Sequence, residues 1–382
     1  MRSYTFSIEQ ANTIEYFLEA LDIIKKPKLI MLYCCPNIDA AYVNEKVYDF
    51  FQGVEVIGGL TGTIICGATR KNENLLVIYD EDEVEKTISV LIHLDDIAKG
   101  VFDLFKKSNS VFGKPLRYLN QEDYVGFIHI CSLLEKEEHL MKTLEVKTHI
   151  DIIGGSASDN LQFEKSDIFY NGKVYSHEAI LLIAKMKIKH AIAKIQSVEK
   201  TGITVKTTRV VGRTLQKLEG ELAGKVYKER VSTLMDDGNI EMDQMFSKYP
   251  FGYEGHDNQI FIRTPQKITE EGYIRNSCTV EANENIHILR TTSIIDSTED
   301  VISKLEKTIH AHNVLGCFEI MCAHRYVELL GDGIHSGNKE KQYETIFQDA
   351  FGEDVNRFGF ISFGEQYIRH ANQTSVVVVF YK

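Results

Sequence analysis

The chain alternates between short, continuous apolar runs and amphipathic stretches with helical spacing. Residues 29–35 are apolar throughout, which predicts a strand buried on both faces. In residues 39–51 apolar side chains recur every three or four positions, as in an amphipathic helix. Residues 54–59 predict a second strand that ends in two glycines, and 75–79 and 87–94 predict two more. This order predicts an α/β or α+β fold of layered, mixed β-sheets with helices.

The same pattern recurs further along the chain. Residues 28–94 and 124–186 align at an offset of 96 positions without a gap, so that Cys35 falls on Cys131. Such self-similarity indicates a repeated strand-helix-strand-strand unit. A third copy near the C-terminus would place Cys322 at the same strand end, and it requires an insertion of 18 residues.

Composition and charge narrow the class of protein. A chain of 382 residues with 43% hydrophobic and 26% charged residues suits two or three globular domains. The formal net charge of -12 argues against nucleic acid or a membrane as partner, because both favour a basic face. We see no apolar run long enough to span a bilayer and no signal peptide. Seven cysteines without framework spacing predict reduced thiols and a cytoplasmic protein.

Several motifs resemble the FIST family in residue type and in order. Cys322–Arg325 resembles the family's C-x-x-R element, and Phe358–Glu365 resembles its G-F-x-S-x-G-E element. Further matches are Val56–Gly62, Ile153–Asp159, Leu218–Gly220, Phe261–Arg263 and the closing Asn372–Thr374. Leu60 and His324 depart from the serine and the glycine that are usual at their positions.

This resemblance implies a FIST N-terminal domain in residues 1–225 and a FIST C-terminal sensory domain in residues 226–382. It implies a bacterial, non-enzymatic sensor for signal transduction that binds a small polar ligand, proposed in the family to include amino acids. A signalling partner protein such as a kinase would receive the output. Some family members resemble haem-carrying nitric-oxide sensors, so haem is the alternative to a protein without a cofactor.

Arg263, Arg325 and Glu365 are the charged candidates for ligand binding. Each follows or interrupts an apolar strand, where a charge must be paired or face a cavity. An arginine fork suits a ligand carboxylate, and Glu365 could accept from an ammonium group. The alternative is a structural Arg–Glu ion pair. We expect the three to converge on one cavity at the junction of the two halves, with Asp159 near its rim.

Four further residues have both a structural and a ligand-binding interpretation. Gly154 and Gly155 either present backbone N–H groups to an anion or only form a tight strand exit. Asp159 either caps its own turn or faces a ligand amine. Asn372 either holds the neighbouring turn or contacts the ligand.

Cys322 is the cysteine with the strongest functional case, because His324 and Arg325 follow it closely. It is either the nucleophile of a cysteine-dependent enzyme or a small buried side chain at a strand end. If haem is bound, His324 or His370 would ligate the iron. The sequence contains no H-E-x-x-H, C-x-x-C or G-x-S-x-G motif, so we assign no catalytic residue and no metal.

Overall fold

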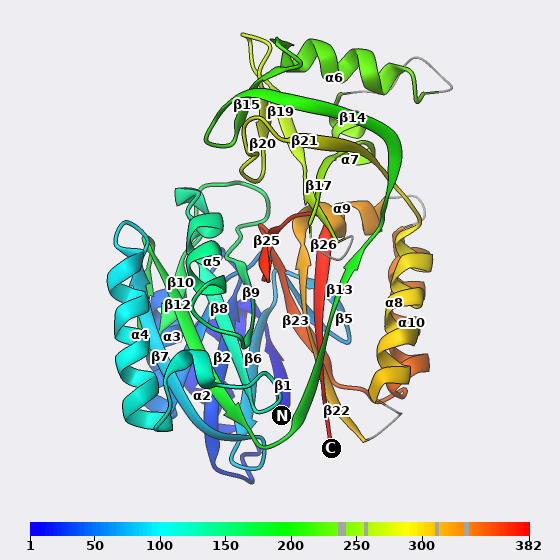
Figure 1. The fold of residues 1–382 in the computed structure, drawn as a ribbon. Helices are drawn as coiled ribbons and strands as arrows, with labels where there is room; N and C mark the ends of the chain where they lie inside the picture. The colour runs from blue at the N-terminus through cyan, green and yellow to red at the C-terminus, as the bar shows by residue number, and fades with distance from the viewer. Residues whose placement is uncertain (236–241, 256–258, 310–312, 332–335) are drawn as a thin grey trace.

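Three copies of one strand-and-helix unit build the body of the protein, and a smaller domain is inserted into the third copy (Figure 1). The computed structural model describes residues 1–235, 242–255, 259–309, 313–331 and 336–382. The copies cover residues 2–80, 84–186 and 189–381, and residues 198–291 of the third copy form the inserted domain. The layered α/β fold of mixed sheets is therefore confirmed.

The strands and helices occur in the same order in each copy, with the following bounds. The first copy contains β1 (Arg2–Phe6), α1 (Ile8–Ala11), α2 (Ile14–Glu19), β2 (Pro27–Cys34), α3 (Ala40–Phe50), β3 (Glu55–Leu60), β4 (Thr63–Cys66), β5 (Ala68–Lys71) and β6 (Asn74–Asp80). The second contains β7 (Val84–His93), α4 (Ile97–Phe112), β8 (Tyr124–Ile130), α5 (Glu137–Glu145), β9 (Asp151–Ser156), β10 (Ile168–Tyr170), β11 (Lys173–Tyr175) and β12 (Glu178–Met186). The third contains β13 (Lys189–Gln196), α8 (Ile294–Ile309), β22 (Val314–Cys322), α9 (Ala323–Leu330), α10 (Ser336–Phe351), β23 (Arg357–Ser362), β24 (Glu365–Tyr367), β25 (Arg369–Ala371) and β26 (Thr374–Tyr381). The inserted domain contains β14 (Val198–Val211), β15 (Thr214–Leu218), β16 (Glu221–Leu222), α6 (Ala223–Ser232), α7 (Met242–Lys248), β17 (Phe251–Glu254), β18 (Ile260–Arg263), β19 (Pro265–Ile268), β20 (Ile274–Asn276) and β21 (Asn285–Thr291).

Parallel strand pairing shows that the first two copies are the same unit. In the first copy β2 pairs with β3, and Leu32 lies opposite Gly58. In the second copy β8 pairs with β9, and Ile128 lies opposite Gly154. Both partners lie 96 positions later in the second copy, so the parallel strand pairs of the two copies share one register. The repeat bounds 28–94 and 124–186 stay a prediction.

The third copy has the same register with a longer helical connection. Glu319 on β22 lies opposite Gly359 on β23, as Leu32 lies opposite Gly58. Glu319 is 287 positions after Leu32, whereas Gly359 is 301 positions after Gly58. The connection is therefore 14 residues longer, so the expected insertion of 18 residues is wrong. Cys322 ends β22 and occupies the position that a cysteine also holds in the other two copies.

The three copies exchange β-hairpins in a closed cycle. The β10–β11 hairpin of the second copy pairs with β3 of the first. The β24–β25 hairpin of the third copy pairs with β9 of the second, and the β4–β5 hairpin of the first pairs with β23 of the third. Each copy thereby covers a strand edge of the copy before it in this cycle.

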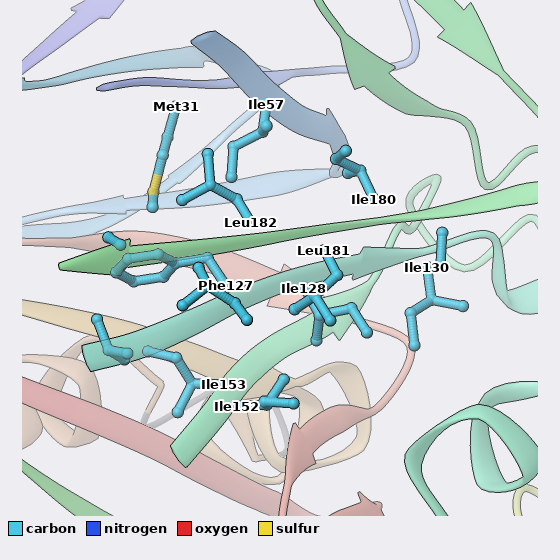
Figure 2. Close-up of a cluster of buried hydrophobic side chains, with 14 of the residues drawn as sticks. Met31, Ile57, Phe127, Ile128, Ile130, Ile152, Ile153, Ile180, Leu181 and Leu182 are labelled. Carbon is cyan, nitrogen blue, oxygen red and sulfur yellow. The ribbon is translucent and has the colours of Figure 1, made fainter. Parts of the chain in front are cut away.

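Apolar side chains from all three copies meet in one core between the sheets. Figure 2 shows part of it, with Met31 and Ile57 of the first copy facing Phe127 and Leu182 of the second. Helices cover the outer faces, and α8 and α10 lie together on the outside of the third sheet (Figure 1). Each fully buried aliphatic or aromatic side chain stabilises the fold by roughly 1.5–3 kcal/mol.

The inserted domain lies over one end of the body (Figure 1). This is the end at which the parallel strand β22 finishes and α9 begins. In α/β sheets, ligands commonly bind just beyond the carboxyl ends of the strands. In the described ranges of the chain, no helix is both long and apolar enough to cross a membrane.

Candidate functional site

Polar side chains form a layer between the inserted domain and the body. Direct hydrogen bonds cross the junction, including Thr264 Oγ1 to Gln373 Oε1 at 2.8 Å. We call the following set the interface layer: Glu137, Glu138, Lys194, Arg213, Arg263, Cys278, Gln366, His370 and Asn372. A buried polar layer of this kind must satisfy its hydrogen bonds internally or through bound molecules.

One arginine of the inserted domain serves two carboxylates of the body. Glu137 and Glu138 occupy the first turn of α5, where acidic side chains interact favourably with the helix dipole. Arg213 Nη2 lies 2.7 Å from Glu137 and 2.8 Å from Glu138. Burial raises the pKa of Glu137 to about 7. Burial acts in the same direction on Glu138, but His370, Arg213 and a backbone N–H hold the pKa of Glu138 below its usual range.

Glu138, Cys278 and His370 bring three different donor atoms together. A carboxylate oxygen, the thiol sulfur and a ring nitrogen lie within 4.8 Å of one another. The three residues come from α5, from the segment after β20 and from β25. The Cys278 thiol donates to Asn372 Oδ1, and the His370 ring shares a 2.9 Å hydrogen bond between Nδ1 and Gln366 Nε2.

Four buried polar atoms of this layer have no hydrogen-bond partner among the described residues. They are Arg213 Nε, His370 Nε2, Gln366 Oε1 and Asn372 Nδ2. An unsatisfied buried polar group costs about 1–3 kcal/mol. Burial lowers the pKa of His370 to about 3, so its ring is neutral at physiological pH. The layer therefore has spare hydrogen-bonding capacity that a bound molecule can use.

Two cations lie on the other side of the layer. Arg263 donates from Nη1 to its neighbour's carbonyl, Ile262 O, at 2.8 Å, and its guanidinium lies 5.6 Å from the Tyr253 ring centroid. Lys194 Nζ lies 4.6 Å from the Phe261 ring centroid. Burial and the Arg263 charge lower the pKa of Lys194 to about 8. Neither cation forms an ion pair with a carboxylate in the part of the chain that the structure describes.

Thr279 connects the acidic and the basic sides of the layer. Its backbone N–H donates to Glu138 Oε1 at 2.6 Å, and its carbonyl accepts from Arg263 Nε at 2.9 Å. The Glu138 carboxylate and the Arg263 guanidinium are therefore both bonded to the backbone of the same residue. This arrangement suits a molecule that carries both charges.

Arg325 lies at the connections between the body and the inserted domain. It is fully buried in α9, where Nη1 donates to Ser197 Oγ at 2.7 Å and Nη2 to Thr298 Oγ1 at 2.9 Å. Ser197 joins β13 to β14, the strand that enters the inserted domain, and Thr298 lies in α8, which follows that domain. Arg325 thus links the two chain segments that connect the body with the inserted domain.

Glu365 is fully buried and bonded to hydroxyl groups rather than to an arginine. Ser362 Oγ donates to Oε1 at 2.9 Å, and Thr374 Oγ1 donates to Oε2 at 2.5 Å. Burial raises the pKa of Glu365 to about 8, so the side chain is mostly neutral at pH 7. Only its ionised form would raise the pKa of Lys194, and the two side chains form no ion pair among the described residues. Arg263, Arg325 and Glu365 thus have different partners, and their convergence on one cavity stays a prediction.

The structure gives Asp159 and the paired glycines structural roles. Asp159 accepts backbone N–H bonds from Phe163, Glu164 and Lys165 at 2.7–2.8 Å, so it caps its own turn. A Cβ atom on Gly154 would lie 1.7 Å from the Ile128 carbonyl oxygen. On Gly155 it would lie 2.8 Å from side-chain atoms of Ile320 and Ser362. These glycines allow close strand packing. We leave Asp159, Gly154 and Gly155 out of the proposed site.

Cys322 and His324 lie beside the interface layer rather than in it. Burial raises the pKa of the Cys322 thiol well above its usual value, which disfavours the thiolate that a nucleophile requires. The strand ends at Cys322, and Arg325 turns away into α9. His324 Nε2 lies 3.5 Å from Ser277 Oγ. The buried-side-chain interpretation of Cys322 is the one its surroundings favour.

The sequence analysis missed six members of the layer: Glu137, Glu138, Lys194, Arg213, Cys278 and Gln366. None lies in a motif, and Lys194 looks like an ordinary strand lysine. Asn372 and His370, which were expected as candidates, do lie in the layer. The unusual residue in the local pattern is Arg213, which is buried although it lies in the turn between two strands.

Comparisons with known families match two models, whose boundary falls inside the inserted domain. Residues 28–221 match the FIST N domain and residues 223–368 match the FIST C domain. The chain therefore belongs to the FIST family, whose members are non-enzymatic, small-ligand sensory domains of signal transduction. The division at residues 225 and 226 stays a prediction.

An uncharacterized protein of Methanocaldococcus jannaschii is similar to part of the chain. The two are 24% identical over 199 residues, which is 49% of this chain and 38% of the other protein. The chain thus matches well under two thirds of that relative.

Proposed function

We propose that the protein senses a small polar ligand with a carboxylate group, such as an amino acid, in the interface layer. The observation that carries the proposal is the position of Arg263 and Lys194. Both cations lie at the junction, and both lack a carboxylate partner among the described residues. A ligand carboxylate would supply that partner, and a guanidinium binds it with charge-assisted hydrogen bonds.

The acidic side of the layer supports a ligand that also carries an amine. Glu138 stays ionised, and Thr279 holds it close to Arg263. In this proposal Glu138 takes the place that the sequence analysis gave to Glu365, because Glu365 is largely protonated. A zwitterion would then bind with its carboxylate toward Arg263 and Lys194 and its amine toward Glu138.

The output would be a change in how the inserted domain sits on the body. A ligand between two domains stabilises the arrangement that contacts it from both sides. Arg325 links the two chain segments between body and inserted domain, so such a change would alter its hydrogen bonds to Ser197 and Thr298. A partner protein that reads this change, for example a cytoplasmic kinase, belongs to the proposal.

A thermal-shift screen tests the proposal directly. The native protein is heated with each proteinogenic amino acid and with their decarboxylated amine analogues. A ligand that binds only the folded state raises the melting temperature. We expect an amino acid to raise it and its amine analogue to have no effect. If no carboxylate compound shifts the melting temperature, the proposal is wrong.

Haem fits the described layer poorly. Of the two histidines considered, His370 is better placed because its Nε2 has no partner among the described residues. Donor atoms of Glu138 and Cys278, however, lie within 4.8 Å of the His370 donor atom. They occupy the space in which a porphyrin plane would stand. The layer would have to open before a haem could bind.

A further inference from the structure

We propose that Glu138, Cys278 and His370 form a binding site for one divalent transition-metal ion of the zinc type. Their donor atoms lie within 4.8 Å of one another. Zinc binds nitrogen at about 2.0–2.1 Å and sulfur at about 2.3 Å, so a nitrogen and a sulfur ligand of one tetrahedral ion lie about 3.6 Å apart. Small side-chain movements would therefore complete the site.

The donor set selects the class of metal. A thiolate, an imidazole and a carboxylate together suit a borderline ion such as Zn²⁺ rather than Ca²⁺ or Mg²⁺, which prefer oxygen. Three protein ligands leave one position of a tetrahedral zinc ion open. Asn372 Oδ1 accepts from the Cys278 thiol, and Asn372 Nδ2 has no partner among the described residues.

An independent observation also points to a ligand at this place. His370 is only 1% exposed, and its Nε2 is unpartnered within the described ranges. Gln366 Oε1 is unpartnered as well, although its amide lies beside His370 Nδ1. Rotating that amide by half a turn lets Oε1 accept a hydrogen bond from the Nδ1–H group, which frees the His370 Nε2 lone pair for a metal. The flip gives Oε1 a partner, and a bound ion would give Nε2 one.

The neighbouring charges are compatible with a cation. Arg213 and Arg263 approach the cluster, while Glu137 and Glu138 share the Arg213 guanidinium. Arg213 and the Thr279 N–H each use one lone pair of Glu138, and each oxygen keeps another. On binding, Cys278 loses its thiol proton to solvent and the thiolate bonds the ion. No oxidant or reductant is needed.

This inference goes beyond the proposed function and does not depend on it. Amino-acid binding rests chiefly on Arg263 and Lys194, whereas metal binding rests on Cys278, His370 and Glu138, of which only Glu138 also belongs to the proposed ligand site. Cobalt and zinc are tested without any amino acid, so the two proposals can fail separately. Where both hold, the open position on the metal would be available to the ligand's amine.

A cobalt titration tests the site. The purified protein is stripped with a chelator and titrated with Co²⁺, and the near-ultraviolet thiolate-to-cobalt absorption is recorded. We expect saturation at one equivalent and displacement of the cobalt by Zn²⁺. The Cys278→Ser variant should lose the thiolate band, and His370→Gln should weaken Co²⁺ binding at least tenfold. Cys66→Ser, which changes a cysteine away from the layer, should behave as the native protein.

Two outcomes would overturn the proposal. One is the absence of a saturable thiolate band in the folded native protein. The other is a band that persists unchanged in Cys278→Ser. Should Cys278→Ser fail to fold, the native titration and a melting-temperature rise with Zn²⁺ that is absent in His370→Gln still decide the question.

Discussion

Glu138 and Arg263 are held on either side of a single residue, Thr279. The Thr279 N–H donates to the Glu138 carboxylate, and the Thr279 carbonyl accepts from the Arg263 guanidinium. Glu138 belongs to the body and Arg263 to the inserted domain. The two charges are thus close without neutralising each other directly. This relationship makes the junction suitable for a ligand of mixed charge.

Replacing Arg213 should strongly destabilise the protein. The Arg213→Met variant leaves Glu137 and Glu138 buried without their cation. Breaking a buried ion pair from one side costs about 3–5 kcal/mol. Urea unfolding measures the loss in free energy of unfolding. The Arg213→Met/Glu137→Gln double variant should recover part of it, and a single variant as stable as the native protein would refute this role.

The stability of the body should fall in mild acid because of His129. This residue is buried in the core, where its Nε2 shares a 2.9 Å hydrogen bond with Tyr33. Burial lowers the pKa of His129 from 6.5 to about 3. Below pH 6.5 the unfolded chain binds a proton that the folded chain does not, so stability falls as the pH drops toward 3. The slope per group is about 1.4 kcal/mol per pH unit.

The His129→Gln variant isolates this contribution, because other buried histidines remain in it. Chemical denaturation of both proteins between pH 7 and 4 gives the two stability profiles. We expect the slope of stability against pH to be smaller in the variant, by the amount that corresponds to about one bound proton. Parallel profiles would show that His129 is not the group responsible.

Cys322→Ala should cost stability and leave ligand binding intact. The side chain is small and buried at a strand end, so its loss leaves a cavity worth about 1 kcal/mol. Denaturation and calorimetry on the same preparation measure both quantities. Weakened binding with unchanged stability would instead favour a chemical role for the thiol.

Gly154→Ala should prevent normal folding of the second copy. The new Cβ would lie 1.7 Å from a backbone oxygen of β8, which cannot move without breaking the strand pairing. We expect a loss of more than about 3 kcal/mol, beyond the usual range for single substitutions. Gly212→Ala is the control: its φ is +57° and no atom lies within 4 Å of the new Cβ, so only about 1–2 kcal/mol of backbone strain is expected. Equal losses in the two variants would contradict the packing argument.

The spacing of the first two parallel strand pairs was predictable from the sequence, because strand pairing fixes spacing. The offset of 96 residues reflects the identical register of β2–β3 and β8–β9. It does not extend to the closing strands, because Leu32 lies opposite Leu76 whereas Ile128 lies opposite Leu181. The hairpin exchange was not predictable, because hairpin sequences do not show which sheet they join. The third copy was misjudged by four residues, because Gly364 was matched to Gly59, whose counterpart in the structure is Phe360.

The candidate site was only partly predictable for a similar reason. His370 and Asn372 belong to a recognisable C-terminal element. Glu138 and Cys278 are 140 positions apart and meet only because the inserted domain folds over α5. Lys194 lies on a strand whose exposed end carries another lysine, Lys189, and only its burial distinguishes it.

Calorimetry on two lysine variants tests the central claim most directly. The amino acid with the largest thermal shift is titrated into the native protein, into Lys194→Gln and into Lys189→Gln, whose substitution lies at the exposed end of the same strand. A lost charge-assisted hydrogen bond costs about 1.5–3 kcal/mol. We therefore predict an affinity roughly 10- to 150-fold weaker for Lys194→Gln and native affinity for Lys189→Gln. Equal affinities in all three proteins would contradict binding at the interface layer.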